Sequence, residues 1–309
     1  MIDMHYDLLS VAYKCYKLGD YSYLINWSKN YNDNNVTGCI ANLYFMSRVE
    51  MQNDLGNYYD PDVSVLDMFL TAVKVVKKYL PNIDFVFSIE GCDYIKDTNE
   101  LVELHKNGLR NILLVWNNPN LYGSGNNGSY GLTDMGCRFL RCAIDLGICI
   151  DLSHMNINTF NDTISLLKDE KRKGKNVKVI VSHSNCYDIW NHPRNLTDQQ
   201  LMDLKELDAV VGLVSYTRFI GDESYSMERL ENIYLDHIDR VVNILGIDHV
   251  GVSSDDMTFG FDLLNDDGYA KQLFKYDKIA NNLTKLLSRK YNKEEIDKIL
   301  YKNIYNKLF

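Results

Sequence analysis

The sequence predicts an α/β fold of the (β/α)8 or TIM-barrel type, and two observations support this prediction. Eight short runs of apolar and β-branched residues alternate with amphipathic stretches of helical period, a pattern typical of parallel strands joined by helices. The chain has 309 residues, a usual length for one barrel, so we expect a single domain over residues 1–309. The pattern alone also leaves open a doubly wound open sheet.

The strands are expected at the apolar runs, and turn-forming residues separate them from the helical stretches. One interval is irregular: residues 117–130 are rich in Asn and Gly, and we expect a long loop there, after the fourth strand. The eight predicted strands cover residues 2–6, 36–46, 85–89, 111–116, 149–152, 177–182, 209–216 and 249–253.

Several helices have boundary signals in the sequence. One stretch of helical period ends before Pro81, because proline cannot continue a helix, and another ends at Gly147. Thr197, with Gln200 three positions later, forms a capping box that predicts the start of a third helix. The helices expected from the periodicity and these signals cover residues 68–80, 132–146, 198–207 and 294–308.

Composition excludes several classes of partner. The formal net charge of −9 argues against nucleic acid, whose phosphates need a basic surface. No apolar run approaches the ~20 residues of a membrane span, and residues 1–7 form a predicted strand where a signal peptide would have a basic and then an apolar segment. The seven cysteines form no C-x-x-C pair, which fits a reducing compartment. We therefore expect a cytoplasmic protein without a membrane or nucleic-acid partner.

Residues of the types that bind metal ions follow the ends of the predicted strands. The carboxyl ends of all strands in a barrel meet at one rim, so residues far apart in the sequence become neighbours there. His5 and Asp7 are two positions apart, so both side chains leave the same face of the chain. Glu90 closes the third predicted strand. The other candidates follow strands five, six and eight: His154, His183 and Asp255.

This combination of imidazoles and carboxylates suits zinc ions. A carboxylate that binds two such ions holds them ~3.5–4 Å apart around a shared water. Glu90 is the best candidate for this bridge, which predicts two Zn²⁺ ions per chain and hydrolysis by a metal-activated water. A single His-x-Asp pair is more often a hydrogen-bonded surface pair, so the prediction depends on ligand-type residues at several strand ends together.

A series of motifs resembles the membrane (renal) dipeptidase family of zinc metallopeptidases, peptidase family M19. The motifs occur in the order of that family and span nearly the whole chain. They are Ile-Asp-Met-His-Tyr-Asp (2–7), Ser-Ile-Glu-Gly (88–91), Leu-Thr-Asp-Met-Gly (132–136), Leu-Gly-Ile-Cys-Ile-Asp-Leu-Ser-His (146–154), Val-Ile-Val-Ser-His-Ser-Asn (179–185), Pro-Arg-Asn-Leu-Thr-Asp (193–198) and His-Val-Gly-Val-Ser-Ser-Asp (249–255).

The resemblance implies a role for each candidate ligand. His5 and Asp7 would bind one zinc ion, His154 and His183 the second, and Glu90 would bridge them. Such a centre is of the metallo-dependent hydrolase type, and the implied activity is hydrolysis of dipeptides. Family members are often dimers, so the resemblance also suggests a homodimer.

The resemblance assigns further residues to catalysis and substrate binding. Asp255 matches the acidic residue that moves protons between the water and the leaving amine. Arg194 matches the arginine that binds the free C-terminal carboxylate of the dipeptide, a task that suits a planar guanidinium. The family often has a histidine at the end of strand four, where this chain has Trp116 followed by Asn117. We expect these two residues to line the substrate pocket.

Two other functions remain open from the sequence. One is the hydrolysis of a different small amide, such as an N-acyl amino acid, a lactam or a thiol conjugate, because specificity in barrels depends on loops. The other is a barrel that binds a small molecule without turnover. Measurements of bound metal and of dipeptide hydrolysis would distinguish these functions.

Overall fold

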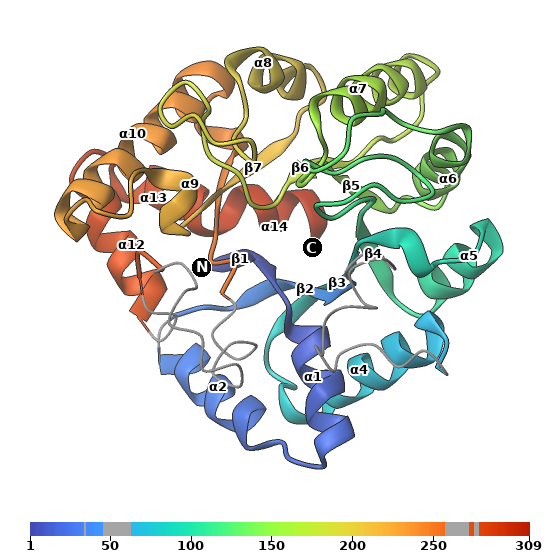
Figure 1. Cartoon of the computed structure of the whole chain (residues 1–309). Helices are drawn as coiled ribbons and strands as arrows, with labels where there is room; N and C mark the ends of the chain where they lie inside the picture. The colour runs from blue at the N-terminus through green and yellow to red at the C-terminus, as the bar shows by residue number, and fades with distance from the viewer. Residues whose placement is uncertain (34, 46–62, 257–271, 275–277) are drawn as a thin grey trace.

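The structure is a computed structural model that describes residues 1–33, 35–45, 63–256, 272–274 and 278–309. Its eight strands are all parallel and follow one another around the sheet in the order β1 to β8, with the helices in a ring outside them (Figure 1). This arrangement confirms the (β/α)8 prediction, and the open doubly wound alternative is wrong because its strand order would reverse at a switch point.

The strands lie where the apolar runs predict them, with small shifts at their ends. The fourth strand begins and ends earlier than residues 111–116, and Met46, the last residue of the second predicted strand, lies outside the described residues. The strands are β1 (Ile2–Tyr6), β2 (Gly38–Tyr44), β3 (Asp84–Glu90), β4 (Leu109–Leu113), β5 (Cys149–Asp151), β6 (Val179–Val181), β7 (Val210–Val214) and β8 (Val250–Ser253).

Many of the helices begin after a residue whose side chain accepts a hydrogen bond from the first turn, as at Ser64, Asp97 and Thr133. Thr197 and Gln200 form the predicted capping box. The described helices are α1 (Leu8–Leu18), α2 (Ser22–Asp33), α4 (Val65–Tyr79), α5 (Thr98–Lys106), α6 (Asp134–Asp145), α7 (Ile157–Arg172), α8 (Asp198–Glu206), α9 (Thr217–Ile220), α10 (Met227–Leu245), α12 (Ile279–Leu287), α13 (Lys293–Asp297) and α14 (Asn303–Leu308). None of them is long and apolar enough to cross a membrane.

The first and last strands meet and bring the sheet round into a barrel. The backbone N–H of Asp255 donates to the carbonyl of His5 at 3.2 Å. The buried carboxylate of Asp3 accepts from both the backbone N–H and the hydroxyl of Ser254, at 2.9 and 2.5 Å. Residues about 250 positions apart are thereby held together directly below the rim.

Apolar side chains fill the amino end of the barrel. Met4 belongs to this group, and α14 crosses this end of the barrel and adds Ile304 to it (Figure 1). Gly251 leaves the space that Met4 occupies, because a Cβ atom there would lie 2.2 Å from its sulfur. The buried members of the group are Ile2, Met4, Ile40, Val86, Cys149, Ile180, Val210 and Ile304.

The interior becomes polar toward the carboxyl end of the strands. Along β3, alternate residues run from Val86 through Ser88 to Glu90, and all three are buried. Alternate residues of a strand share one face, so these three side chains line the interior from the apolar amino end of the barrel to the rim. Asn42 on β2 and Asn111 on β4 are buried at the level of Ser88. The barrel therefore positions its acidic and imidazole groups above a layer of polar side chains.

Candidate metal centre

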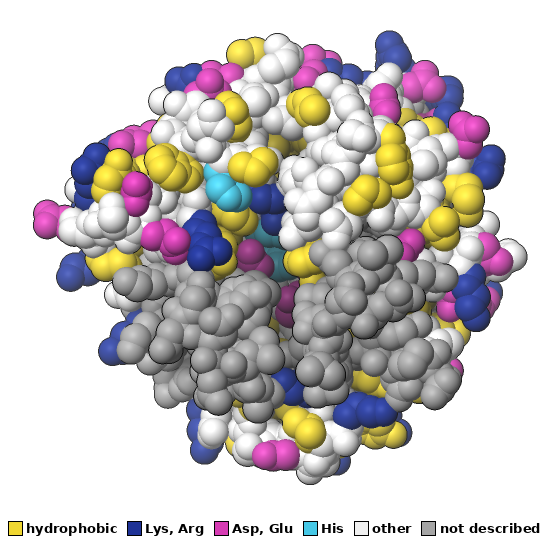
Figure 2. All heavy atoms as spheres, viewed as in Figure 1, with side chains coloured by type: hydrophobic (Ala, Val, Ile, Leu, Met, Phe, Trp, Pro, Cys, Tyr) yellow, Lys and Arg dark blue, Asp and Glu magenta, His cyan; other side chains and the backbone are white. Residues whose placement is uncertain are grey.

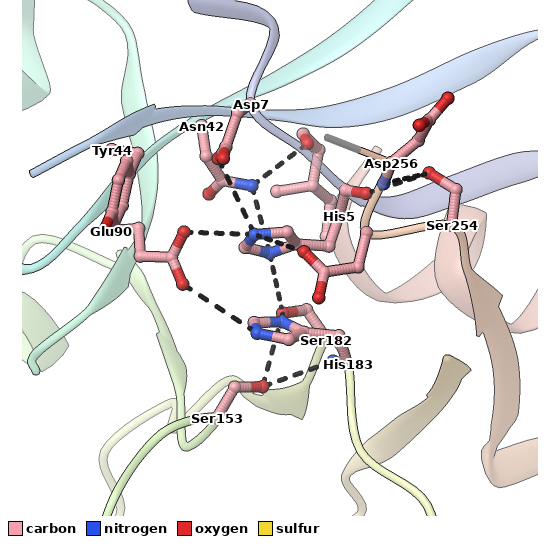
Figure 3. Close-up of polar contacts among 12 residues, drawn as sticks. His5, Asp7, Asn42, Tyr44, Glu90, Ser153, Ser182, His183, Ser254 and Asp256 are labelled. Atoms are coloured by element: carbon pink, nitrogen blue, oxygen red, sulfur yellow. Dashed lines mark hydrogen bonds and ion pairs between the residues drawn. The ribbon is translucent and has the colours of Figure 1, made fainter. Parts of the chain in front are cut away.

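The six ligand-type residues expected at strand ends lie together at the carboxyl rim. Figure 3 shows four of them, His5, Asp7, Glu90 and His183. His5 belongs to β1 and Glu90 ends β3, while the other side chains lie in loops or turns directly after strands. Their ligand atoms form three overlapping groups, each with its atoms within 4.8 Å of one another. The groups are His5 with Asp7 and Glu90, Glu90 with His154 and His183, and His5 with His183 and Asp255.

Glu90 lies at the centre of these groups and is almost fully buried. Its Oε2 atom is 3.1 Å from Nε2 of His5. Its Oε1 atom is 3.0 Å from Nε2 of His154 and 3.8 Å from Nε2 of His183. One carboxylate oxygen therefore faces each side of the cluster, which is the arrangement that a bridging ligand needs.

Two further carboxylates face His5. Oδ1 of Asp7 is 3.8 Å from Nε2 of His5, and Oδ1 of Asp255 is 3.9 Å from the same atom. Asp7 precedes the first residue of α1, but its side chain makes no capping hydrogen bond, so the carboxylate remains directed at the cluster.

The backbone is left-handed at two of the candidate residues. His154 has φ 68° and Asp255 has φ 48°. Residues with a Cβ rarely adopt this conformation, which costs about 1 kcal/mol or more and persists where the surroundings enforce it. At Asp255 the hydrogen bond to the His5 carbonyl provides such enforcement. Both turns occur where a strand ends and its next side chain must face the rim.

Three carboxyl groups, those of Asp7, Glu90 and Asp255, are crowded around His5 in the cluster. Burial and the charge of Glu90 raise the pKa of Asp7 well above its ordinary value, and burial raises the pKa of Asp255. Burial alone would lower the pKa of His5, but Glu90 outweighs it and raises this pKa to about 10. Burial would raise the pKa of Glu90, but His5 and His154 keep it well below its ordinary value. Cations would relieve this repulsion.

The two histidines on the other side are neutral. Burial lowers the pKa of His154 to about 3 and the pKa of His183 well below its ordinary value. Nδ1 of His154 lies 2.9 Å from Oδ1 of Asn117. An amide oxygen only accepts, so Nδ1 must carry the hydrogen and Nε2 presents a lone pair.

The inner atoms of the cluster have the chemistry of a cation site. The Nε2 lone pair of His154 lies 2.9 Å from Nε2 of His183, and acceptors this close need a hydrogen or a cation between them. Oε1 of Glu90 and Oδ1 of Asp7 are buried and have no hydrogen-bond partner among the described residues. Imidazole nitrogens and carboxylate oxygens are zinc ligands, so these residues fit a cation on each side of Glu90.

Trp116 and Asn117 lie beside His154 as the end of strand four predicts, but in different ways. The indole of Trp116 is half-buried, with its ring centroid 5.2 Å from the ring of Tyr44 and 6.0 Å from the ring of His154. Trp116 and Tyr44 thus form a wall beside the cluster. Asn117 instead uses its amide oxygen to orient His154, a role that the sequence analysis did not anticipate.

Arg194 lies close enough to the cluster for its charge to act on it. Burial lowers the pKa of its guanidinium to about 10, while Asp255 and Glu90 act in the opposite direction, so the group stays charged at neutral pH. The guanidinium stacks on Phe219 with 5.2 Å between its carbon and the ring centroid. Its Nη2 is buried without a hydrogen-bond partner in the described part of the chain. On the face of the molecule shown in Figure 2, a hollow opens near the centre, and basic, acidic and histidine side chains lie around it.

Sequence reasoning missed several residues that surround the histidines. Tyr44 supplies half of the aromatic wall, and the buried side chains of Asn42, Ser153 and Ser182 lie within hydrogen-bond distance of His5 or His183 atoms. One signal was available. Asn42 and Ser182 are polar residues within or directly after apolar, β-branched runs, where a strand core would place apolar side chains.

The fold and the rim cluster define a class: TIM barrels with a candidate metal centre at the carboxyl ends of their strands. The chain belongs to the membrane dipeptidase family, peptidase family M19, because the sequence model of that family matches residues 45–306.

Curated relatives match part of the chain. An uncharacterized protein encoded in the pqqA 5′ region of Klebsiella pneumoniae is 33% identical over 180 residues, which cover 55% of this chain and 64% of the relative. Dipeptidase verJ of Clonostachys rogersoniana is 28% identical over 176 residues, covering 55% and 42%. The chain spans about half the length of the curated relatives it matches.

A solved structure matches the whole barrel. It is the metallopeptidase from Rhodobacter sphaeroides, which holds a phosphinate mimic of the dipeptide L-Ala-D-Ala. The TM-score is 0.73 and the identity 20%, over 100% of this chain and 99% of the other. At this identity the likeness shows the fold.

Proposed function

We propose that this chain is a zinc-dependent dipeptidase, which hydrolyses the peptide bond of a dipeptide with a free C-terminal carboxylate. The observation that carries the proposal is the position of Glu90, with Oε2 3.1 Å from His5 and Oε1 3.0 Å from His154. In this proposal His5 and Asp7 hold one Zn²⁺ ion, His154 and His183 hold the second, and Glu90 bridges them. Membership of the membrane dipeptidase family supports the same activity.

Bound zinc would supply a water of lowered pKa and would polarise the scissile carbonyl. The residues of the chain supply the proton transfers and the orientation. Asp255 faces His5 across 3.9 Å, and burial raises its pKa, so its carboxyl group can take up a proton and release it to the leaving amine. It is the only residue of the cluster that we assign to proton transfer.

Arg194 is proposed to bind the C-terminal carboxylate of the substrate. Its position fits because Phe219 supports one face of the guanidinium while the buried Nη2 lacks a partner in the described chain. A guanidinium binds a carboxylate through two parallel charge-assisted hydrogen bonds. A charged anchor close to the cluster favours short substrates, because the scissile bond must lie near both.

A single experiment tests the function. The purified chain, loaded with zinc, is assayed against a panel of L,L- and L,D-dipeptides, and its bound metal is measured in parallel. We expect two zinc ions per chain and turnover of at least part of the panel, with Glu90→Gln losing metal and activity together. A metal-loaded wild type that hydrolyses no dipeptide would favour another amide substrate, and a wild type without bound metal would favour a binding protein.

A second candidate, hydrolysis of a different small amide, is favoured by Trp116 in the place where relatives often have a histidine. If the indole is a pocket wall, as its contact with Tyr44 suggests, Trp116→His should raise turnover of simple L,L-dipeptides and weaken binding of the native substrate. The only hydrogen-bond donor that the indole of Trp116 offers to an oxyanion is its N–H. Loss of one oxyanion donor lowers kcat by ~10²- to 10³-fold, which sets the scale of the effect. A uniform loss across the panel would instead show that Trp116 contributes to the chemistry.

We also propose that the chain acts in the cytoplasm as one domain and without a nucleic-acid partner. The seven cysteines, all among the described residues, form no disulfide with one another, which fits a reducing compartment. A homodimer stays a prediction, and light scattering of the purified protein would test it.

A further inference from the structure

The hydroxyl of Ser182 lies between two histidines that belong to different sides of the cluster. Its Oγ is 3.2 Å from Nδ1 of His5 and 2.8 Å from Nδ1 of His183 (Figure 3). The side chain is fully buried. One hydroxyl oxygen therefore contacts the outer nitrogens of two imidazoles whose inner nitrogens face opposite oxygens of Glu90.

The groups behind Ser182 determine the direction of its hydrogen bonds. Asp151 Oδ1 accepts from the Ser153 hydroxyl at 2.9 Å and from the Ser182 backbone N–H at 3.0 Å. Ser153 has thus used its only hydrogen on the carboxylate, and its oxygen can accept from the Ser182 hydroxyl, 3.3 Å away. The Ser182 hydrogen then points to Ser153, which leaves two lone pairs for the two imidazoles.

We propose that Ser182 is a positioning residue shared by both metal sites, which accepts Nδ1–H from His5 and from His183 at once. This inference rests on the metal centre of the proposed function. The arrangement uses the full hydrogen-bonding capacity of the Ser182 hydroxyl, which donates its one hydrogen and accepts at both lone pairs. It also fixes both rings so that their Nε2 atoms face the cluster, which is how outer hydrogen bonds increase metal affinity.

Other outer partners serve one histidine each and provide a comparison within the same cluster. Asn117 Oδ1 contacts only Nδ1 of His154. Asn42 lies with Nδ2 3.1 Å from Nδ1 of His5, and its Oδ1 is buried without a partner among the described residues. The same Nδ2 donates to the carbonyl of Ile40 at 3.3 Å, so Asn42 joins His5 to the backbone of β2 and reaches no second histidine ligand. Ser182 differs from both because its loss affects one ligand of each ion.

Zinc titration of the full chain tests the inference, with Zn²⁺ alone as the probe and free zinc set by a competing chelator. Removal of an outer partner typically lowers metal affinity ~10- to 100-fold. Ser182→Ala should weaken both ions by about 10-fold or more, whereas Asn117→Ala should weaken mainly the ion bound by His154 and His183. Ser182→Thr keeps the hydroxyl and should restore both affinities.

Controls distinguish this role from a general loss of structure. Ser184→Ala removes another buried hydroxyl two residues away, for which the described chain shows no hydrogen bond to a histidine, and should leave both affinities unchanged. Melting curves of the metal-free variants establish that each is folded. Wild-type affinity for both ions in folded Ser182→Ala, or weakening of one ion alone, would overturn the inference. A wild type that binds fewer than two zinc ions would instead overturn the proposed metal centre.

Discussion

At the scale of single residues, the outer nitrogen of each imidazole determines what its inner nitrogen can do. Asn117 accepts from Nδ1 of His154, so Nε2 of His154 is available as a metal ligand. Burial keeps this histidine neutral at neutral pH. The site is therefore prepared for cations by side chains that would never touch them.

Arg194 gives a prediction at this scale. Loss of a charge-assisted pair costs roughly 2 to 5 kcal/mol when the partner stays buried, so Arg194→Ala should lower kcat/KM for dipeptides by ~30-fold or more. The wild type should discriminate strongly against a dipeptide with an amidated C-terminus, and the variant much less. Steady-state kinetics on the acid and amide pair measure both effects.

The control for Arg194 is an arginine outside the cluster. Arg138 on α6 is exposed, and Arg138→Ala should retain wild-type kinetics on both substrates. If the wild type hydrolyses acid and amide equally well, Arg194 does not bind the carboxylate.

At the scale of elements, close packing between β6 and β7 positions the segment that carries Ser182 and His183. A Cβ atom on Gly212 of β7 would lie 2.1 Å from the backbone carbonyl oxygen of Ser182. A Cβ atom on Gly251 of β8 would instead meet the sulfur of Met4 at 2.2 Å. A flexible side chain can move aside, but a backbone carbonyl in a barrel can do so only with its strand.

Gly212→Ala should therefore be the more harmful of the two substitutions. Overpacking typically costs ~1 to 3 kcal/mol, and Gly212→Ala should lie at or above the upper end of that range while Gly251→Ala lies near the lower end. Chemical denaturation of the two variants measures the difference. Zinc affinity should fall with Gly212→Ala, because displacement of Ser182 also moves His183. Equal stability of the two variants would show that the strand absorbs the extra atom.

His237 on α10 joins the loop after β6 to α9. Its Nδ1 accepts from the backbone N–H of Cys186 at 3.1 Å, and its Nε2 donates to the carbonyl of Ile220 at 3.0 Å. Ile220 follows Phe219, on which Arg194 stacks. A neutral imidazole satisfies both bonds, and burial lowers its pKa to about 4.

This shift predicts a pH dependence of stability. Below the ordinary histidine pKa of ~6.5 the unfolded chain binds a proton, while folded His237 stays neutral until about pH 4. The free energy of unfolding should therefore fall as the pH decreases through this range, by ~2 kcal/mol between pH 7.5 and 5. His237→Gln should lose this part of the dependence, which denaturation curves at several pH values measure. Parallel curves for wild type and variant would contradict it.

The sequence predicted the elements where a local pattern determines them. Apolar β-branched runs located all eight strands, and Thr197 with Gln200 located the start of α8. The last helix was expected to be continuous over residues 294–308, but a π-helical turn at Lys298–Lys302 separates α13 from α14. This turn accompanies long-range contacts, since Asn303 donates to the carbonyls of Ile247 and Val250 and Ile304 enters the barrel. Periodicity carries no information about such contacts.

The candidate site shows the same division. His5, Glu90, His154 and His183 were located from strand ends, because a barrel brings all strand ends to one rim. The contacts of Ser182 with both rings and of Asn117 with His154 could not be predicted. They depend on loop conformation and on the left-handed turn at His154, which no spacing in the sequence specifies.

At the scale of the whole molecule, bound metal should stabilise the closed barrel, because its ligands come from strands on both sides of the sheet. The proposed ligands come from β1, from β3 and from the loops after β5 and β6, and the first and last strands meet beside them through Asp3 and Ser254. Ions held by both halves of the sheet stabilise the closed barrel, because they bind the folded chain and not the separated strands.

Removal of metal should accordingly lower the melting temperature. A ligand at about 1,000 times its Kd contributes about 4 kcal/mol of stability per site, and for a chain of this size each kcal/mol shifts Tm by roughly 2 °C. Excess chelator should therefore lower the Tm of the zinc-loaded protein on the order of 10 °C, and added zinc should restore it. Glu90→Gln should melt at a temperature that neither chelator nor zinc changes much, because the proposed bridge between the two ions is lost. A wild type with bound zinc whose Tm does not respond to the chelator would show that the ions do not stabilise the closure of the barrel.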